Sequence, residues 1–244
     1  GEVVMTKLLN LIVLPMGKIL SFLYSFIGNY GVTLILLTLI VKLVTFPLYK
    51  SQMLNTLKMA ELQPKMKDIQ ARFGHDKALL GAKMQELYKE EKYNPAGGCL
   101  PMLIQMPIIF GLFSLLRDPL SYISDQQLIF AVHEPFLWIA DLSHPDKWIL
   151  PILAGVATFI SFSLSQQAQM GTGQANPASG MKVMKYIFPV AIVLIGRSFP
   201  AGLAIYWFFG QFIQIFISIH LNSVRKKMNQ QKEKSKRMKK AAVN

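Results

Sequence analysis

The chain has 244 residues, of which 52% are hydrophobic and 16% are charged, and its mean hydropathy is +0.35. Because soluble domains usually carry about 25% charged residues, this composition excludes an ordinary soluble domain, and it also excludes intrinsic disorder. The 26 Lys and Arg residues exceed the 13 Asp and Glu residues and give a net charge of +13, which indicates an anionic partner such as nucleic acid, lipid headgroups or an acidic substrate. One cysteine, Cys99, excludes an intramolecular disulfide and a cysteine-based zinc site, and the four histidines are too far apart in sequence to suggest a metal site.

The N-terminal segment, residues 1–29, is predicted to form an amphipathic helix that lies in the membrane interface. Its apolar side chains recur at roughly helical spacing among polar residues such as Lys7, Asn10 and Lys18. These apolar residues are Leu8, Ile12, Ile19, Phe22 and Phe26. A helix that crosses the membrane is the alternative interpretation.

Five later windows are apolar enough to be membrane spans, for which about 20 mostly apolar residues are needed. They cover residues 31–49, 99–116, 148–165, 183–198 and 201–221. Several are short, which a bilayer accommodates by local thinning or by contacts with neighbouring helices. The sequence therefore predicts an all-α polytopic membrane protein with a five-span core over residues 30–221.

Residues 51–92, between the first two spans, are predicted to form a helical hairpin. One apolar stripe runs along its first helix and consists of Leu54, Leu57, Leu62, Met66, Ile69 and Phe73. Pro64 is expected to kink this helix. The chain should turn at Gly74, and Asp76 should cap the second helix. A solvated spacer between the spans is the alternative.

The distribution of basic residues predicts the orientation. Segment 50–98 holds nine Lys and Arg residues, the tail 222–244 holds nine against one acid, and segment 117–147 holds two against five acids. Cytoplasmic segments carry the excess of Lys and Arg, so the hairpin and the tail are expected in the cytoplasm and the N-terminus outside. The basic tail suits either anionic lipid or RNA phosphate, and its composition leaves both open.

Lys42 is the most informative residue, because it lies eleven residues into the first span. A charge near the bilayer midplane costs at least ~2.5 kcal/mol, so Lys42 is expected to face a wet, polar groove, unless its stem snorkels to the interface. Thr38 lies on the same helix face, and Gln105 is a polar residue in the second span. These three residues are predicted to line one groove, with an interhelical hydrogen bond as the alternative for Gln105.

Three motifs, in the order in which they occur, resemble the YidC family of membrane-protein insertases, which has mitochondrial and thylakoid relatives. They are NPAGGCLP at residues 94–101, QMP at 105–107 and FPAGLAIYW at 199–207. The resemblance covers nearly the whole chain. It implies five transmembrane helices around a hydrophilic groove that is open to the cytoplasm and to lipid, an N-terminal interfacial helix on the outer side, a cytoplasmic helical hairpin, and a location in the bacterial plasma (inner) membrane.

The resemblance also implies roles for particular residues. The basic groove residue of the family is usually arginine, and Lys42 occupies the matching position, which keeps the charge but loses the forked contact of a guanidinium. Gln105 and Trp207 match other groove-lining positions. The apolar slide for an incoming helix would comprise Pro101, Met102, Met106, Tyr206, Phe209 and Ile213, for which ordinary packing within the bundle is the alternative.

The implied function is that of a non-enzymatic insertase and chaperone for nascent membrane proteins, without a cofactor or metal. It would act alone or with the Sec translocon, with the ribosome as a further partner and with anionic lipids as a possible partner of the tail. A small-solute channel or transporter is the alternative, and a purely structural membrane scaffold is a third class. The sequence has no internal repeat, no protease or nucleotide-binding motif, and no acid inside a span, which favours the insertase.

Overall fold

The computed structural model describes residues 2–94, 100–118, 121–122, 126–170 and 179–241, and its regular elements are α-helices. In chain order they are α1 (Glu2–Ile27), α2 (Tyr30–Phe73), α3 (Lys77–Glu90), α4 (Leu100–Arg117), α5 (Gln126–Ala131), α6 (Ile149–Met170), α7 (Ser179–Gly196) and α8 (Ala201–Ala241). The predicted all-α fold class is confirmed.

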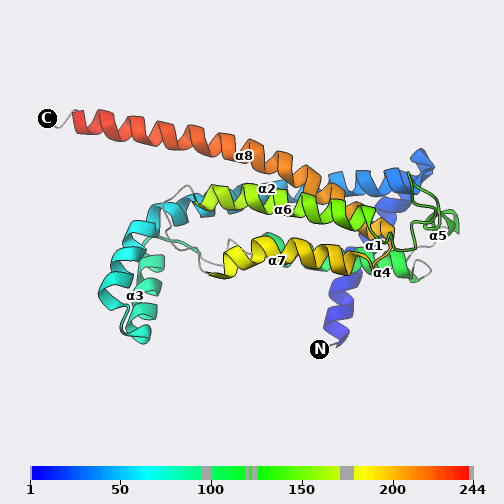
Figure 1. Ribbon diagram of the computed structural model, residues 1–244, viewed down its shortest axis with the longest axis horizontal. Coiled ribbons are helices and arrows are strands. Elements are labelled where there is room, and N and C mark those ends of the chain that lie inside the picture. Colours follow the sequence, from blue (N-terminus) through cyan, green and yellow to red (C-terminus); the bar gives the residue numbers. More distant parts are fainter. Residues whose placement is uncertain (1, 95–99, 119–120, 123–125, 171–178, 242–244) are drawn as a thin grey trace.

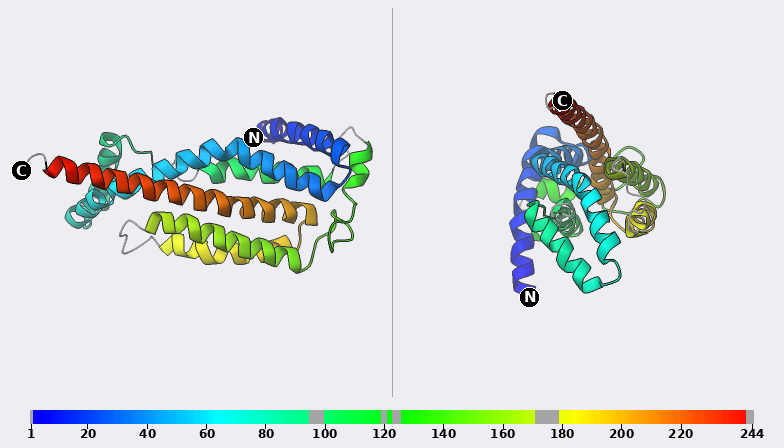
Figure 2. Two further views of the ribbon diagram at one scale, coloured as in Figure 1. Left: turned by 90° about the horizontal axis from the view of Figure 1, so that it is seen from above. Right: turned by 90° about the vertical axis from the view of Figure 1, so that its left-hand side faces the viewer.

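The long helices form an elongated bundle (Figure 1). Helix α8 lies between α2 and α6, α7 packs on α6, and α4 contacts α1, α2 and α8 (Figure 2). The hairpin that contains α3 projects from one end of the bundle, whereas α5 and the loop that follows it lie at the opposite end (Figure 1). One end of the molecule is therefore formed by a helical hairpin and the other by a short helix and a loop.

The apolar helices agree in position with the predicted spans. Two segments are long and apolar enough to cross a membrane, Tyr30–Gln52 in α2 and Ala201–Met228 in α8. The shorter apolar helical segments are Leu11–Ile27, Gln105–Arg117, Ile149–Ser165 and Lys185–Gly196. The helical membrane fold is thus supported, and the number of five spans stays a prediction.

Two helices continue beyond the boundaries that their polarity suggested. Helix α2 runs without a break through residues 50 and 51, so the first span and the first hairpin helix are one helix. Helix α8 likewise runs through residue 222 to Ala241. The basic tail is therefore a helical extension of the last apolar segment as far as the structure describes it.

The hairpin has its own small core. Asp76 caps α3 as predicted, since its side chain accepts hydrogen bonds from the backbone N–H groups of Ala78 and Leu79. Leu62 of α2 is buried against Leu87 of α3 and against Tyr93. The hairpin is also closed by polar contacts, which are an ion pair between Lys65 and Glu91, a bond from Lys58 Nζ to the Lys92 carbonyl (3.0 Å) and one from Asn55 Nδ2 to the Asn94 carbonyl (3.0 Å).

Helix α1 runs obliquely to the long axis of the bundle (Figures 1 and 2). It packs mainly on α4 and α2, and its buried face carries Val13, Met16 and Leu20. Of the predicted apolar stripe, Ile19, Phe22 and Phe26 are exposed and Ile12 is half-buried. The side chain of Leu8 lies outside the described residues. The interfacial position of α1 stays a prediction.

Helices α6 and α7 approach each other closely at Gly155. A Cβ atom at this position would lie 2.4 Å from Val193 Cγ2 and 3.1 Å from the Pro189 carbonyl oxygen. Small residues permit such contacts between membrane helices. We expect Gly155→Leu to destabilise the protein by about 1–3 kcal/mol through overpacking, measured as a lower midpoint of thermal unfolding in detergent.

Gly81 on α3 supplies the control for this prediction. A Cβ atom at Gly81 would have no neighbour within 4 Å, and alanine is the better helix former by about 0.8–1.0 kcal/mol. Gly81→Ala should therefore keep or raise the midpoint. If Gly155→Leu unfolds at the wild-type temperature, the close approach of α6 and α7 is wrong.

Candidate functional site

The ammonium group of Lys42 is buried between α2 and α8. Its residue is 5% exposed, and Nζ donates hydrogen bonds to Tyr49 Oη (3.1 Å) and Gln214 Oε1 (3.4 Å). Nζ also lies 5.1 Å from the centroid of the Tyr49 ring. Within the described part of the chain, Lys42 takes part in no ion pair. Burial of a cation costs free energy when it has no charged partner. Because the acceptors of Lys42 are neutral, binding of an anion would offset part of this cost.

Helix α8 makes room for the lysine at Gly210. A Cβ atom there would lie 3.6 Å from Lys42 Cε and 3.7 Å from Thr38 Cγ2, so the backbone of α8 faces both side chains. Thr38 is buried on the same face of α2 as Lys42, as predicted. Its hydroxyl donates to the Leu34 carbonyl oxygen (2.7 Å), so Thr38 turns its methyl group rather than its hydroxyl towards Gly210.

The sequence did not single out two members of the polar cluster, Tyr49 and Gln214. Tyr49 lies two helical turns after Lys42, so helical periodicity was an available signal. Gln214 lies 172 residues away, and no local pattern connects it to Lys42. The side-chain amide of Gln214 also faces Ser218 Oγ, at 3.5 Å from Nε2, which orients its carbonyl oxygen towards the ammonium.

Gln105 meets α8 at a different point. Its Nε2 atom donates to Tyr206 Oη (3.3 Å), which is the interhelical hydrogen bond considered as the alternative for this residue. Gln105 of α4 thus contacts α8 at Tyr206, whereas Lys42 of α2 contacts α8 at Gln214. A role of Gln105 in lining the groove stays a prediction.

Trp207 lies two helical turns before Gln214, on nearly the same face of α8, and contacts α6 and α7. Its indole Nε1 donates to Thr158 Oγ1 (2.9 Å), and its ring centroid lies 6.1 Å from that of Phe188. These contacts place Trp207 in the packing between α6, α7 and α8. Its predicted groove-lining role is untested.

The predicted slide residues differ in their surroundings. Tyr206 is buried, and Met106, Phe209 and Ile213 are half-buried. The side chains of Pro101 and Met102 lie outside the described residues. The exposed aromatic residues of α8 are instead Phe212 and Phe216, whose ring centroids lie 5.1 Å apart.

The described residues contain no group of three or more His, Cys, Asp or Glu residues arranged to hold a metal ion. What the described site offers is a desolvated positive charge with neutral partners. Such an arrangement can attract a carboxylate and form a charge-assisted hydrogen bond with it. It contains no nucleophile paired with a base.

Comparisons with known proteins agree in the family that they indicate. The sequence profile of the family described as "60Kd inner membrane protein" matches residues 22–236. The chain is 41% identical over 204 residues to the membrane protein insertase YidC of Shewanella loihica, an alignment that covers 83% of this chain and 35% of the relative. The YidC of Shewanella piezotolerans gives the same identity and coverage. The chain thus spans about a third of the length of these curated relatives.

The fold is also similar to that of a solved structure. It resembles the "Active YidC insertase crystal structure with the first transmembrane domain resolved", with a TM-score of 0.58 and 25% sequence identity. The superposition covers 89% of this chain and 46% of the other.

Proposed function

The chain belongs to the 60Kd inner membrane protein family, in agreement with the resemblance drawn from its motifs, and we propose that it acts as a non-enzymatic insertase and chaperone for nascent membrane proteins. The observation that carries this proposal is the buried ammonium of Lys42, which has only neutral hydrogen-bond partners. A positive site inside an apolar bundle has a clear use if it receives a negatively charged client segment.

The proposed mechanism needs no covalent step. An acidic residue in the short outer tail of a client would approach Lys42 and replace the amide oxygen of Gln214, since a carboxylate forms the stronger, charge-assisted bond. This contact would offset the cost of removing the tail from water. The apolar client helix would then move into lipid, driven by the hydrophobic effect.

The wider groove and its apolar slide belong to the same proposal. Lys42, Thr38, Gln105 and Trp207 would line the groove, which would be open to the cytoplasm and to lipid. The slide would comprise Pro101, Met102, Met106, Tyr206, Phe209 and Ile213. The half-buried aromatic surface of α8 around Phe209, which contacts Phe208 with ring centroids 5.1 Å apart, supports an apolar path beside the polar cluster.

The relatives named above and the family description place the chain among bacterial inner-membrane proteins with helical spans. Its orientation is part of the proposal. The concentration of Lys and Arg in segments 50–98 and 222–244 supports a cytoplasmic hairpin and C-terminus and an outer N-terminus. The ribosome and the Sec translocon are the proposed partners in delivery.

Reconstitution tests the insertase against a solute channel or transporter. The purified chain would be incorporated into protein-free liposomes and given a single-span client with an acidic outer tail, and protease protection of that tail would be measured. An insertase protects the tail and leaves an entrapped solute inside. Release or uptake of solute without protection of the tail would favour the channel instead.

The basic tail should contribute to ribosome binding. Because Asn222 Nδ2 donates to the Leu164 carbonyl oxygen (3.2 Å), truncation after Met228 preserves the packing of α8 and still removes six of the nine basic residues of the tail. We expect weaker co-sedimentation with ribosomes and a flatter salt dependence, because fewer phosphate contacts release fewer counterions.

A full-length variant with these six residues changed to Gln is the matched control, because it keeps the length of the chain and loses the charge. It should behave like the truncation. If both variants bind ribosomes normally but lose binding to anionic vesicles, the tail is a lipid-binding element.

A further inference from the structure

A half-open pocket of about 450 Å³ lies beside the loop that follows α5, which is at the end of the bundle opposite the hairpin (Figure 1). It is lined by the C-terminal end of α4, the loop that follows α5, and the connection between α7 and α8. Phe113, Leu116 and Val132 form part of an apolar floor, whereas Arg117, His133 and His144 supply basic groups. The lining is therefore amphiphilic, with nitrogen donors on one part and hydrocarbon on another.

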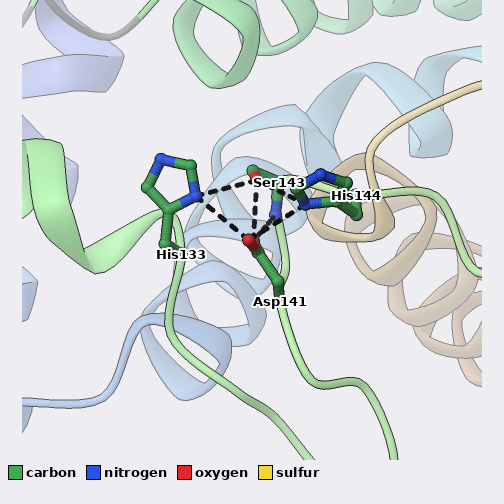
Figure 3. Close-up of polar contacts among 4 residues, drawn as sticks. All are labelled: His133, Asp141, Ser143 and His144. Carbon is green, nitrogen blue, oxygen red and sulfur yellow. Dashed lines mark hydrogen bonds and ion pairs between the residues drawn. The ribbon is translucent and has the colours of Figure 1, made fainter.

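A hydrogen-bonded cluster holds the two histidines in place (Figure 3). Asp141 Oδ2 lies 3.1 Å from His133 Nδ1 and 2.9 Å from His144 Nδ1, and Ser143 Oγ donates to Asp141 Oδ1 (2.7 Å). Burial by itself would raise the pKa of Asp141, but the bonds from Ser143, His133 and His144 outweigh it and lower this pKa to about 2. The carboxylate is thus ionised, and it holds both rings through contacts with their Nδ1 atoms.

The second nitrogen of each histidine remains available. Both Nδ1 atoms are used by the cluster, and Nε2 of His133 points away from it (Figure 3). Hydrogen bonds among the described residues use neither Nε2 atom.

Arg117 is the permanent positive charge of the cavity. Its guanidinium lies 5.6 Å from the centroid of the Phe113 ring and belongs to no ion pair of the described residues. Among the described residues, the other acids near this end have hydrogen-bond partners: Asp118 accepts from Ser121 Oγ, Glu134 from Tyr24 Oη and the Tyr30 N–H, and Asp146 from Trp138 Nε1 and the Leu150 N–H. Arg117 is thus a positive charge that an external anion could approach.

This end of the bundle also has the features of a membrane interface. Trp138 and Trp148 are exposed there, and the Arg197 guanidinium lies 3.9 Å from the centroid of the Trp148 ring. Trp residues and the charged ends of basic side chains gather at the level of the lipid headgroups. A ligand that reaches the cavity from the bilayer would therefore present a headgroup to it.

We propose that the cavity binds the phosphate diester of a phospholipid from the leaflet opposite the hairpin. Arg117 would pair with the phosphate, the hydroxyl of Ser198 would donate a further hydrogen bond to it, and the floor at Leu116 would contact the glycerol and upper acyl carbons. Guanidinium groups bind phosphate oxygens through two parallel bonds. The apolar floor favours a lipid over free phosphate, which would leave that surface wet.

Native mass spectrometry of the full chain in detergent tests this site. Phosphatidylglycerol, dioleoylglycerol, which lacks phosphate, and inorganic phosphate would be added separately. Arg117→Gln should weaken phosphatidylglycerol binding by about tenfold or more, as expected for the loss of a charge-assisted contact. Arg197→Gln is the matched control, because it removes the same charge at the same end without altering the cavity lining, and it should bind as the wild type does.

One further variant tests the same site. Ser198→Leu, which adds an apolar side chain at the cavity, should reduce binding without a change in charge. Three results would each overturn the phospholipid site. Arg117→Gln and Arg197→Gln could lose phosphatidylglycerol binding equally, or dioleoylglycerol could bind as well as phosphatidylglycerol. The third is displacement of the lipid by stoichiometric inorganic phosphate.

Discussion

Lys42→Glu is expected to abolish insertion of clients with acidic outer tails, while Lys42→Arg keeps it. Lys42 is buried on α2, and its charge is the feature that would attract a client carboxylate into the site. Reversal of that charge replaces attraction with repulsion in a poorly solvated site, where loss of one partner of a charge pair costs about 2–5 kcal/mol. Insertion yields should therefore fall by at least about tenfold.

Clients with acidic and neutral tails should be compared for each variant. Lys50→Glu is the matched control, because Lys50 is an exposed residue of the same helix and undergoes the same charge reversal. It should insert both clients at the wild-type level. Equal yields of the acidic client for Lys42→Glu and wild type would remove the electrostatic role of Lys42.

The contact between Lys42 and Gln214 offers a second test of whether the charge of Lys42 attracts the client. Gln214→Glu is nearly isosteric and would place a carboxylate where the amide oxygen now lies 3.4 Å from Nζ. The resulting internal ion pair would compete with the client carboxylate, so this variant should lose the acidic client as Lys42→Glu does. Gln214→Leu should keep the positive charge available and should retain insertion.

Deletion of residues 51–92, replaced by a short Gly/Ser bridge, is expected to leave a folded membrane core that inserts clients poorly. The hairpin core consists of Leu62, Leu87 and Tyr93, and α3 packs on the distal part of α2. The larger core, which joins α1, α2, α4, α8 and the loop that follows α5, does not include these residues. Thermal unfolding should therefore stay near that of the wild type, while insertion falls because clients lose their first docking surface.

Movement of the hairpin relative to the bundle would require α2 to bend. Because α2 is continuous through residues 50 and 51, this movement is not a rotation about a loop, and Pro47 lies where bending of the helix is easiest.

Exchange of the exposed pair, Lys83→Glu with Glu86→Lys, should have little effect on insertion, since surface ion pairs contribute about 0.2–1 kcal/mol. Crosslinking of clients next to Lys42 in the deletion variant checks the prediction, and wild-type crosslinking together with wild-type insertion would reduce the hairpin to a spacer.

Local features of the chain could be predicted from the sequence. Apolar runs indicate the helices of a membrane protein, because lipid offers no hydrogen-bond partners and the backbone N–H and C=O groups must bond to each other within a helix. The cap at Asp76 was predictable, since a side-chain oxygen before a helix pairs with its first N–H groups. The wet, polar groove expected around Lys42 stays a prediction. Helix ends were less predictable, because Lys, Glu, Gln and Met are good helix formers and α2 and α8 continue through polar sequence.

Only the tertiary structure decided which polar residues meet. Helical periodicity places Thr38 and Lys42 on one face of α2, but it says nothing about which helix faces them or at what height. The rotation and depth of α8 bring Gln214 to Lys42 and Tyr206 to Gln105, while Trp207, one residue further along, points to Thr158. Successive residues of a helix point about 100° apart, so a small rotation of α8 would change every one of these pairs. Packing of the whole bundle sets that rotation.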